Sequence, residues 1–375
     1  MLREVQMNIP QERLAIFVPS MRGGGAERAM LKLARGIADR GYIVDLVLAQ
    51  AEGPYLAEVP QAVQVVDLKA SRVLNSLPAL VRYLRRERPL AMLSAMSHAN
   101  IIALWARRLP GIVTRVVVSE RDTLSRSVQN EPSRRGRLMP KLIRRFYPWA
   151  DGIVAVSNGV AADLAQVTSI PRQRIQVIYN PVVTPDFQQK ARATLNHPWF
   201  KPGEPPVLLA VGRLTMQKDF LMLIQAFAQV RKLRPARLLI LGEGEERPKL
   251  EAQVKQLGLE GDVKLPGFVA NPYPYMARAS LFVLSSKWEG LPGVLIEALY
   301  CGALLISTDC PSGPREILAG GQYGQLVPVG YVAAMAQAIE TTLAGKTPRP
   351  SDDSWRPFEL ETAVSKYVSL LLGSE

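Results

Sequence analysis

Short apolar runs alternate with longer amphipathic segments along the first half of the chain. RLAIFVP (13–19) and YIVDLVLA (42–49) are typical of buried strands, and the segment 25–41 between them has the apolar spacing of a helix. The same alternation predicts further strands at 90–96, 114–120, 152–157 and 175–179. The second half repeats the pattern, with strands predicted at 206–212, 236–242, 262–267, 280–285 and 302–308 and helices at 220–233 and 246–258.

Strands that alternate with helices predict parallel sheets covered by helices on both faces. Two such series predict an α/β protein with two Rossmann-like, doubly wound domains. The Pro-rich, polar segment 181–206 between them is the expected linker. We therefore expect one domain at 1–185, a second at 186–354 and a terminal segment, 355–375, that ends in a helix.

Composition excludes several classes of protein. The 375 residues include only two cysteines, Cys301 and Cys310, and two histidines, so a disulfide framework or a Cys/His zinc site is not expected. No stretch approaches the roughly 20 apolar residues that span a bilayer. The first 20 residues lack the pattern of a signal peptide, and we expect a cytosolic protein.

The formal net charge of +13 is unevenly distributed. Residues 1–190 contain 27 Lys and Arg against 15 Asp and Glu, whereas the remainder contains 19 against 18. The first half is therefore expected to meet a negative partner. Nucleic acid, an anionic membrane and a phosphorylated substrate are all compatible with the charge alone.

Ligands of open parallel sheets bind beyond the carboxyl ends of the strands. After the first strand, SMRGGGAERAM (20–30) has glycines before a helix, which favours contact with phosphate, although neither a dinucleotide fingerprint nor a P-loop is present. A simple tight turn is the alternative. After the strand at 206–212, Arg213 and Lys218 are placed to hold a diphosphate, unless this is only a solvated loop.

The stretch WEGLPGVLIEAL (288–299) carries Glu289 just before a turn and Glu297 inside an apolar segment. Pro292 suits a helix start, and the amides near Gly293 favour an anion. A buried Glu297 needs a hydrogen-bonding partner such as a ribose diol, unless it lies on an exposed helix face. The loop GEGEERPKL (242–250) is acidic, so a base or ribose contact is expected there rather than phosphate. His98 follows another strand, where a capping or core histidine is the alternative.

These motifs together resemble the retaining glycosyltransferases of family 4, which have the B-type two-domain fold. SERDT (119–123), VAVSNGV (154–160), VIYNPV (177–182), LPGF (265–268) and SGPREIL (312–318) also match landmarks of that family over nearly the whole chain. The resemblance implies two domains facing a cleft, with the acceptor on the first, the nucleotide-sugar donor on the second and the C-terminal helix packed back on the first. It also implies catalysis without a metal or other cofactor, and the sequence has no D-x-D motif.

The resemblance assigns roles to particular residues. Arg213 and Lys218 would neutralise the diphosphate, Glu297 would hold the ribose, Glu289 would contact the transferred sugar, and His98 would lie beside the reacting sugar. The catalytic set is His98, Glu289, Arg213 and Lys218. The donor would also contact amides or side chains of Gly23, Gly24, Glu243, Phe268, Val269, Gly290, Leu291, Pro292, Gly293 and Val294.

The segment 125–149 concentrates the positive charge. Leu138, Leu142, Phe146 and Trp149 recur at helical spacing, and Pro140 predicts that a helix starts near it. The pattern resembles an interfacial membrane helix, with a helix that packs inward as the alternative. The cations expected at the acceptor or membrane are Arg28, Arg134, Arg135, Arg137, Lys141, Arg144 and Arg145.

The resemblance implies transfer of a hexose or N-acetylhexosamine, with UDP favoured as the nucleotide. Attraction of the basic segment to a membrane fits a lipid-linked acceptor such as a polyprenyl-diphosphate glycan. The enzyme would lie on the cytoplasmic face of the membrane and bind no nucleic acid, because no nucleic-acid-binding motif accompanies the positive charge. An epimerase of the same fold and a non-catalytic protein that binds nucleotide or nucleic acid are the alternatives.

Overall fold

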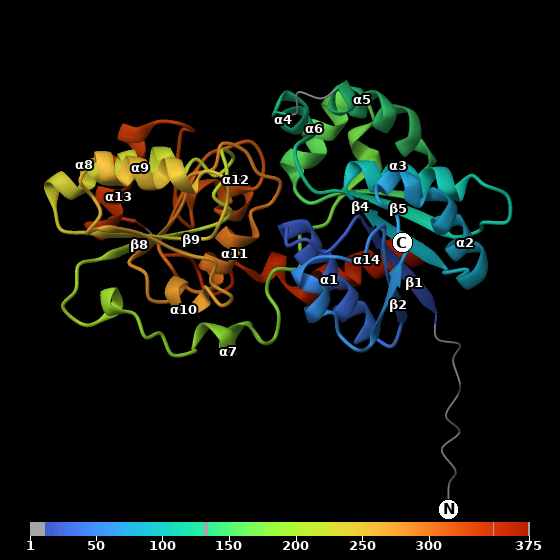
Figure 1. Ribbon diagram of the computed structural model, residues 1–375, viewed down its shortest axis with the longest axis horizontal. Coiled ribbons are helices and arrows are strands. Elements are labelled where there is room, and N and C mark those ends of the chain that lie inside the picture. The colour runs from blue at the N-terminus through green and yellow to red at the C-terminus, as the bar shows by residue number, and fades with distance from the viewer. Residues whose placement is uncertain (1–11, 131–133, 348, 374–375) are drawn as a thin grey trace, which may run out of the picture.

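The computed structural model describes residues 12–130, 134–347 and 349–373, and in this part of the chain two parallel sheets form two α/β domains (Figure 1). The first sheet has the order β3-β2-β1-β4-β5-β6-β7 and the second the order β10-β9-β8-β11-β12-β13. The strands of the first are β1 (Arg13–Val18), β2 (Ile43–Leu48), β3 (Val63–Asp67), β4 (Ala91–Ala95), β5 (Arg115–Glu120), β6 (Gly152–Ala155) and β7 (Ile175–Val177). Those of the second are β8 (Val207–Val211), β9 (Arg237–Leu241), β10 (Val263–Gly267), β11 (Leu281–Leu284), β12 (Leu305–Thr308) and β13 (Gln325–Val327).

Helices connect the strands. In the first domain they are α1 (Gly25–Ala38), α2 (Leu77–Glu87), α3 (Ser97–Arg107), α4 (Leu124–Asn130), α5 (Arg134–Phe146) and α6 (Asn158–Thr168). The short α7 (Phe187–Ala191) lies in the segment between the sheets. The remaining helices are α8 (Phe220–Leu233), α9 (Arg247–Gln256), α10 (Tyr273–Met276), α11 (Gly293–Tyr300), α12 (Pro314–Ile317), α13 (Val332–Leu343) and α14 (Leu360–Leu372).

Both faces of the first sheet are buried, which explains its continuous apolar strands. Along β1, Leu14 and Ile16 pack on one side with residues of α1 and α14, whereas Ala15 and Phe17 pack on the other side with residues of α2 and α3. The second sheet is also covered on both faces. Leu208 belongs to a core with α8, α9 and α13, and Leu209 to a core with α10 and α11.

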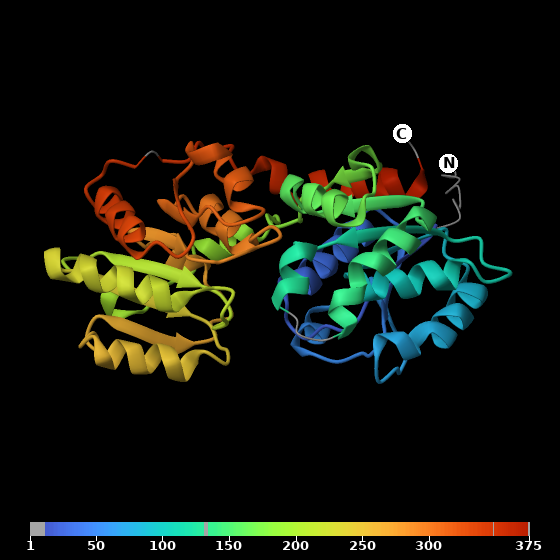
Figure 2. The ribbon, with the colours of Figure 1, turned by 90° about the horizontal axis from the view of Figure 1, so that it is seen from above.

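Helix α14 returns to the first domain after the chain has completed the second sheet. Val364, Tyr367 and Leu371 are buried in the same cluster as Leu14 and Met30, and α14 lies beside α1 (Figures 1 and 2). The predicted fold class, with its C-terminal helix crossing back, is therefore confirmed. No helix in the described ranges is long and apolar enough to cross a membrane.

In each sheet the strand order reverses once: the first strands of the domain are added on one side of its first strand, and the later strands on the other side. In the first sheet β1 is flanked by β2 and β4, and in the second β8 is flanked by β9 and β11. Crevices open at such switch points, beyond the carboxyl ends of the strands. The loop after β1 carries the glycine-rich segment, and His98 lies at the start of α3, just after β4. The loops after β8 and β11 carry Lys218 and Glu289. The sheet order therefore accounts for where the predicted site residues lie.

Two strands and one helix boundary differ from prediction. β3 and β13 were not predicted, because β3 is a mostly exposed edge strand and β13 has only three residues. Helix α5 begins at Arg134 and contains Pro140, so the predicted helix start at the proline is wrong. Proline removes one donor from the helix but does not end it here, and its ring tends to kink a helix interior. Of the N-terminal segment, which lacks the sequence pattern of a signal peptide, residues 1–11 lie outside the described residues.

Candidate active site

A buried ion pair lies at the switch point of the second sheet. Lys218 Nζ, in the loop after β8, donates to Glu289 Oε1 at 2.6 Å, and Ser286 Oγ donates to the same oxygen at 2.6 Å. A second bond joins the two loops, because the Ser285 hydroxyl Oγ donates to the Lys218 backbone carbonyl at 2.6 Å. Glu289 is 6% exposed. A lysine has three donors, so Lys218 can hold Glu289 and a phosphate oxygen together.

The turn after Glu289 lies against the first domain. A Cβ atom at Gly290 would be 2.1 Å from the Arg121 carbonyl oxygen, so only glycine fits there. The Gly290 carbonyl accepts hydrogen bonds from Ser157 of the first domain at 2.9 Å and from Ser312 at 2.8 Å. Leu291 and Pro292 are buried, and α11 begins at Gly293. The first amides of α11, near the half-buried Val294, therefore lie close to the contact between the domains.

The second glutamate, Glu297, is buried, so the exposed alternative is wrong. It is 7% exposed and accepts a hydrogen bond from Tyr273 Oη at 3.3 Å. Burial and the nearby Glu297 carboxylate raise the pKa of Tyr273, which keeps the phenol protonated as a donor. A carboxylate in this position can accept hydroxyl donors from a ribose.

Arg28 of α1 reaches this carboxylate from the other domain. Its Nη1 lies 3.9 Å from Glu297 Oε1, and its Nη2 donates to Tyr273 Oη at 3.2 Å. Arg28 was expected among the acceptor-facing cations, but it lies against the predicted ribose carboxylate because α1 starts beside α10 and α11. The neighbouring Lys32 donates to the Val182 carbonyl at 2.6 Å, and burial lowers its pKa to about 8.

The residues expected around the base come together at the next strand ends. Glu243 follows β9 and is held by Arg247 through bonds of 2.8 and 2.7 Å. A Cβ at Gly267, the last residue of β10, would lie 2.8 Å from Glu243 Oε1, so this strand ends next to the carboxylate. Phe268 is 75% exposed and Val269 is half-buried. An exposed aromatic ring beside a carboxylate suits stacking and hydrogen bonding of a base.

The glycine-rich loop and Arg213 are less enclosed. Gly23 has φ +109°, and Gly24 precedes α1 with no side chain to cap it. Gly24 has no side chain that could accept hydrogen bonds from the N-terminal amides of α1. A phosphate contact requires such amides to be available as donors. Arg213, after β8, is exposed. Arg213 and Lys218 lie near opposite ends of the loop between β8 and α8, and their joint binding of a diphosphate stays a prediction.

His98 is the second residue of α3 and is exposed. It follows Met96, a non-glycine residue with φ +79°, a conformation that L-residues rarely adopt. The core-histidine alternative is therefore wrong. The strained residue turns the chain sharply from β4 into α3, so that His98 stands at the carboxyl edge of the sheet.

Sequence reasoning missed the contacts that join the domains here. Glu316 of the second domain accepts the Asn158 and Gly159 amides at the N-terminus of α6, both at 2.9 Å, and Tyr179 Oη at 3.2 Å. Helix N-termini favour carboxylates. In the sequence SGPREIL and VAVSNGV are separate landmarks, and no local pattern reveals that they meet across the domains.

The basic helix α5 divides its residues between two faces. Arg137, Lys141 and Arg144 are exposed at helical spacing, as is Arg145. Arg134 and Arg135 begin the helix, but their side chains lie outside the described residues.

The apolar face of α5 packs mainly inward, in contrast to the expected membrane boundary. The Phe146 ring packs edge-to-face on Trp105 of α3 at 5.4 Å and on Trp149 at 4.9 Å, and Ile143 is fully buried. Leu138 is 51% exposed. The aromatic residues predicted at the membrane boundary thus stabilise the contact with α3, and the exposed face is mainly cationic.

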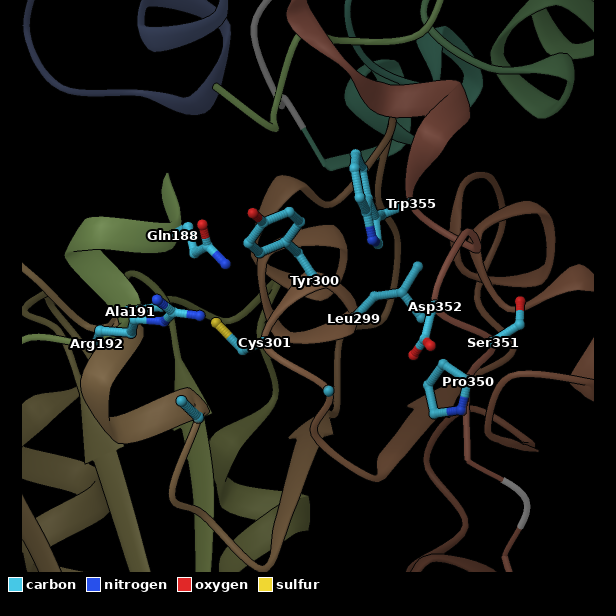
Figure 3. A pocket seen from close by; sticks show the side chains of 12 residues that line it. Gln188, Ala191, Arg192, Leu299, Tyr300, Cys301, Pro350, Ser351, Asp352 and Trp355 are labelled. Atoms are coloured by element: carbon cyan, nitrogen blue, oxygen red, sulfur yellow. The ribbon is translucent and has the colours of Figure 1, made fainter. Parts of the chain in front are cut away.

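The cavity in Figure 3 is separate from these residues. It encloses about 340 Å³ between α7, the C-terminal end of α11 and residues 350–355, and contains none of the predicted donor residues. Tyr300 and Trp355 pack edge-to-face at 4.9 Å on one side of it. It is a gap where the two connections between the domains pass each other. Among the described residues, no group of three or more His, Cys, Asp or Glu side chains is arranged to hold a metal ion.

Two Rossmann-like domains that meet at their strand ends, with cations and carboxylates at the start of a helix, define the two-domain class of glycosyltransferases. Family models agree. Residues 23–185 match "Glycosyltransferase Family 4" and residues 205–345 match "Glycosyl transferases group 1".

One relative is the N-acetylgalactosamine-N,N'-diacetylbacillosaminyl-diphospho-undecaprenol 4-alpha-N-acetylgalactosaminyltransferase of Campylobacter jejuni. The two sequences are 34% identical over 344 residues, and the matched region covers 88% of this chain and 90% of the relative. It is 27% identical to the lipopolysaccharide core biosynthesis glycosyltransferase LpsE of Rhizobium meliloti, over 93% of this chain and 96% of that protein. The crystal structure of Anabaena HepE in complex with UDP and glucose has the same fold, with a TM-score of 0.77 and 22% identity over 96% of this chain and 100% of that one. The chain belongs to the glycosyltransferase family that the two family models describe, and it is a hexosyltransferase.

Proposed function

We propose that this enzyme transfers a hexose or N-acetylhexosamine from a UDP-sugar to a polyprenyl-diphosphate-linked glycan, with retention of configuration and without a metal or other cofactor. The observation that carries the proposal is the buried Lys218–Glu289 pair at the start of α11. The Campylobacter relative is named for an undecaprenol-diphosphate acceptor, and the HepE structure contains UDP, which supports these two choices.

In this proposal the donor lies along the switch point of the second sheet. Arg213 and Lys218 bind the diphosphate, and amides at Gly23, Gly24 and the Gly290–Val294 turn add donors. Glu297 binds the ribose diol. The same carboxylate accepts a hydrogen bond from Tyr273 and lies near Arg28. Glu243, Phe268 and Val269 flank the base. Glu289 accepts a hydroxyl of the transferred sugar.

The proposed chemistry follows from where charge develops. As the glycosidic bond to the diphosphate breaks, negative charge grows on the leaving phosphate, and preorganised cations and amides stabilise it. His98 contacts the reacting sugar from the first domain. The acceptor hydroxyl attacks from the face of the leaving group and gives its proton to the leaving phosphate. Glu289 is already bonded to Lys218 and Ser286, which suits a positioning contact better than a nucleophile.

The first domain supplies the acceptor side. The exposed cations of α5 give an electrostatic surface for anionic headgroups, each adding about 1 kcal/mol of attraction near a membrane. We propose that the enzyme sits on the cytoplasmic face of the membrane through this surface. Because Phe146 packs on α3, the attraction is expected to be mainly electrostatic rather than insertion of aromatic rings.

A donor screen tests the proposal. The purified protein is incubated with lipid extract and each UDP- or GDP-sugar, while nucleoside diphosphate release and sugar incorporation into lipid are measured. One UDP-sugar should give a lipid product with retained anomeric configuration, and addition of a chelator should not stop it. Glu289→Gln and Arg213→Ala should lower turnover by roughly 10²-fold or more, as for loss of transition-state stabilisation.

Glu204→Gln is the matched control. Glu204 also pairs with a cation of the second domain, Arg237, but it precedes β8 and so lies at the amino ends of the strands, away from the switch point. It should keep full activity. Isomerisation of a donor without an acceptor would point to an epimerase. Full turnover with a water-soluble acceptor alone would remove the lipid-linked assignment.

A further inference from the structure

A buried carboxylate outside the donor site is bonded to the first turn of α3, which carries His98. Glu120 ends β5 and is 4% exposed. Its Oε2 accepts a hydrogen bond from Ser97 Oγ at 3.0 Å, and its Oε1 accepts from Tyr147 Oη and, at 3.4 Å, from Asn100 Nδ2. Asn100 Nδ2 also donates to Tyr147 Oη at 2.8 Å, so these side chains form a closed network.

The network holds the first turn of α3 on both sides of His98. Ser97 and Asn100 lie on either side of His98 in the first turn of α3. Asn100 is tied to Met96 by a backbone bond of 2.9 Å, and its side chain is tied to the Ser119 carbonyl at 3.0 Å. A residue with φ +79° persists only when its surroundings over-determine it. The Glu120 network supplies such contacts directly after Met96, at Ser97, and beyond His98, at Asn100.

A second buried carboxylate in the same sheet shows what a purely structural pair looks like. Asp45 lies in the middle of β2 and accepts Tyr83 Oη at 2.6 Å, but it also pairs with Arg13 at 2.7 Å. Glu120 has no ion pair among the described residues, and it lies at the carboxyl edge of the sheet. A carboxylate buried without a cation is costly and so calls for a function at that place.

We propose that Glu120 is a positioning residue for His98, holding the Met96–His98 turn in the conformation that directs the imidazole toward the reacting sugar. Tyr147 directly follows α5, so the same network also joins the catalytic turn to the end of the basic helix. The inference rests on the proposed function, because that function assigns His98 to the sugar.

The two histidines of the chain allow a test that does not depend on turnover. With histidine labelled with ¹³C at ring Cε1, the folded protein gives one signal for His98 and one for His197, assigned with His197→Gln. Glu120→Gln and Tyr147→Phe should shift or broaden the His98 signal and leave that of His197 in place. Tyr83→Phe removes the same kind of hydroxyl from Asp45 and should move neither. An unchanged His98 signal in both network variants would overturn the proposal.

Kinetics with the donor and acceptor from the screen then separate positioning from general stability. Tyr147→Phe and Glu120→Gln should lower kcat by roughly 10- to 100-fold, as small misplacements do, with the donor KM within about twofold. Glu120→Gln should retain more activity than Glu120→Ala, because the amide keeps an acceptor. Adding Glu120→Gln to His98→Ala should cost almost nothing further, since Glu120 acts through His98.

The outcomes distinguish the inference from the function on which it rests. An equal fall in kcat in Tyr83→Phe, or additive losses in the double variant, would refute positioning while leaving the transferase intact. If the wild-type protein uses no donor, the proposed function fails, and the histidine signals still decide whether Glu120 orders the turn.

Discussion

The strand order reverses at corresponding places in the two sheets, but residues of different kinds lie at the two switch points. At the second, a lysine and a glutamate are paired in direct contact, and their loops are joined by further bonds. At the first, glycines and a strained methionine shape the backbone, and the buried polar groups below it form no ion pair among the described residues. The second switch point is therefore suited to binding charge. The first is suited to placing one side chain, His98, against what the second has bound.

The charge outside the crevices differs in the same sense. Residues 1–190 carry most of the excess positive charge, and α5 exposes several of these cations, whereas the second half is nearly neutral. At the site of the second domain Lys218 is paired with Glu289, whereas on α5 of the first domain Arg137, Lys141 and Arg144 are exposed. This division is what an enzyme needs if it encloses a small anionic donor in one domain and meets an extended anionic surface with the other.

The largest effect is expected where charge is paired in the crevice. Lys218→Met removes the cation proposed at the diphosphate and leaves Glu289 buried without its partner, at a cost of about 3–5 kcal/mol for breaking a buried pair. Turnover should fall by about 10²- to 10³-fold. Steady-state kinetics and calorimetry with UDP measure the loss.

The control for this experiment is Lys287→Met, which removes a 39% exposed lysine that lies 3.5 Å from Asp219 beside the same loop. It should change turnover by less than about threefold, as a surface ion pair contributes little. Equal losses in the two variants would mean that the crevice is not distinguished from its surroundings.

A smaller effect is expected on the basic surface. Replacing Arg137, Lys141 and Arg144 together with glutamine should weaken binding to vesicles that contain anionic lipid by about 10²-fold, at about 1 kcal/mol per cation. The residual binding should be lost at high salt. Vesicle sedimentation at several salt concentrations measures it, and nucleotide binding should not change.

Arg82, Arg85 and Arg86 on α2 offer a matched triple substitution, since they are exposed arginines on another helix of the same domain. If this variant loses as much vesicle binding as the α5 variant, net charge rather than the α5 surface explains the attraction.

The last effect is on stability rather than on turnover or binding, and concerns its dependence on pH. Burial raises the pKa of Glu120 to about 7, although hydrogen bonds from Tyr147, Ser97 and Asn100 oppose the rise and Asp122 adds to it. The adjoining Arg121 is bonded to Asn180 instead. Because the folded state holds the proton more tightly than the unfolded state, wild-type stability falls as the pH rises from about 4.5 to 7.

Glu120→Gln removes this titration, so its melting temperature should rise relative to wild type across that interval and then level off. The total change is on the order of 3 kcal/mol, or several °C. Calorimetry from pH 5 to 8 tests the sign. A difference between the two proteins that stays constant with pH would show that Glu120 does not titrate there.

Local pattern predicted most of the scaffold and few of the contacts between domains. α8 has the predicted bounds because apolar residues recur at helical spacing along its length, and most of them are buried in the structure. β3 was missed because an edge strand buries too little to show alternation. Glu289 and Glu297 were recognisable because carboxylates in apolar surroundings need partners. The Gly290–Arg121 contact, the Glu316 bond to α6 and the Glu120 network join residues far apart in sequence, which no single stretch encodes.

The return of α14 ties the first domain to the order of synthesis. Its buried residues, including Tyr367 and Leu371, fill the core beside β1 and α1, yet the ribosome makes them after the whole of the second domain. Until they emerge, the nascent first domain presents an uncovered apolar face along its earliest strand. The first domain to be translated is therefore the last to be finished, and a chaperone has the interval between the two events in which to bind it.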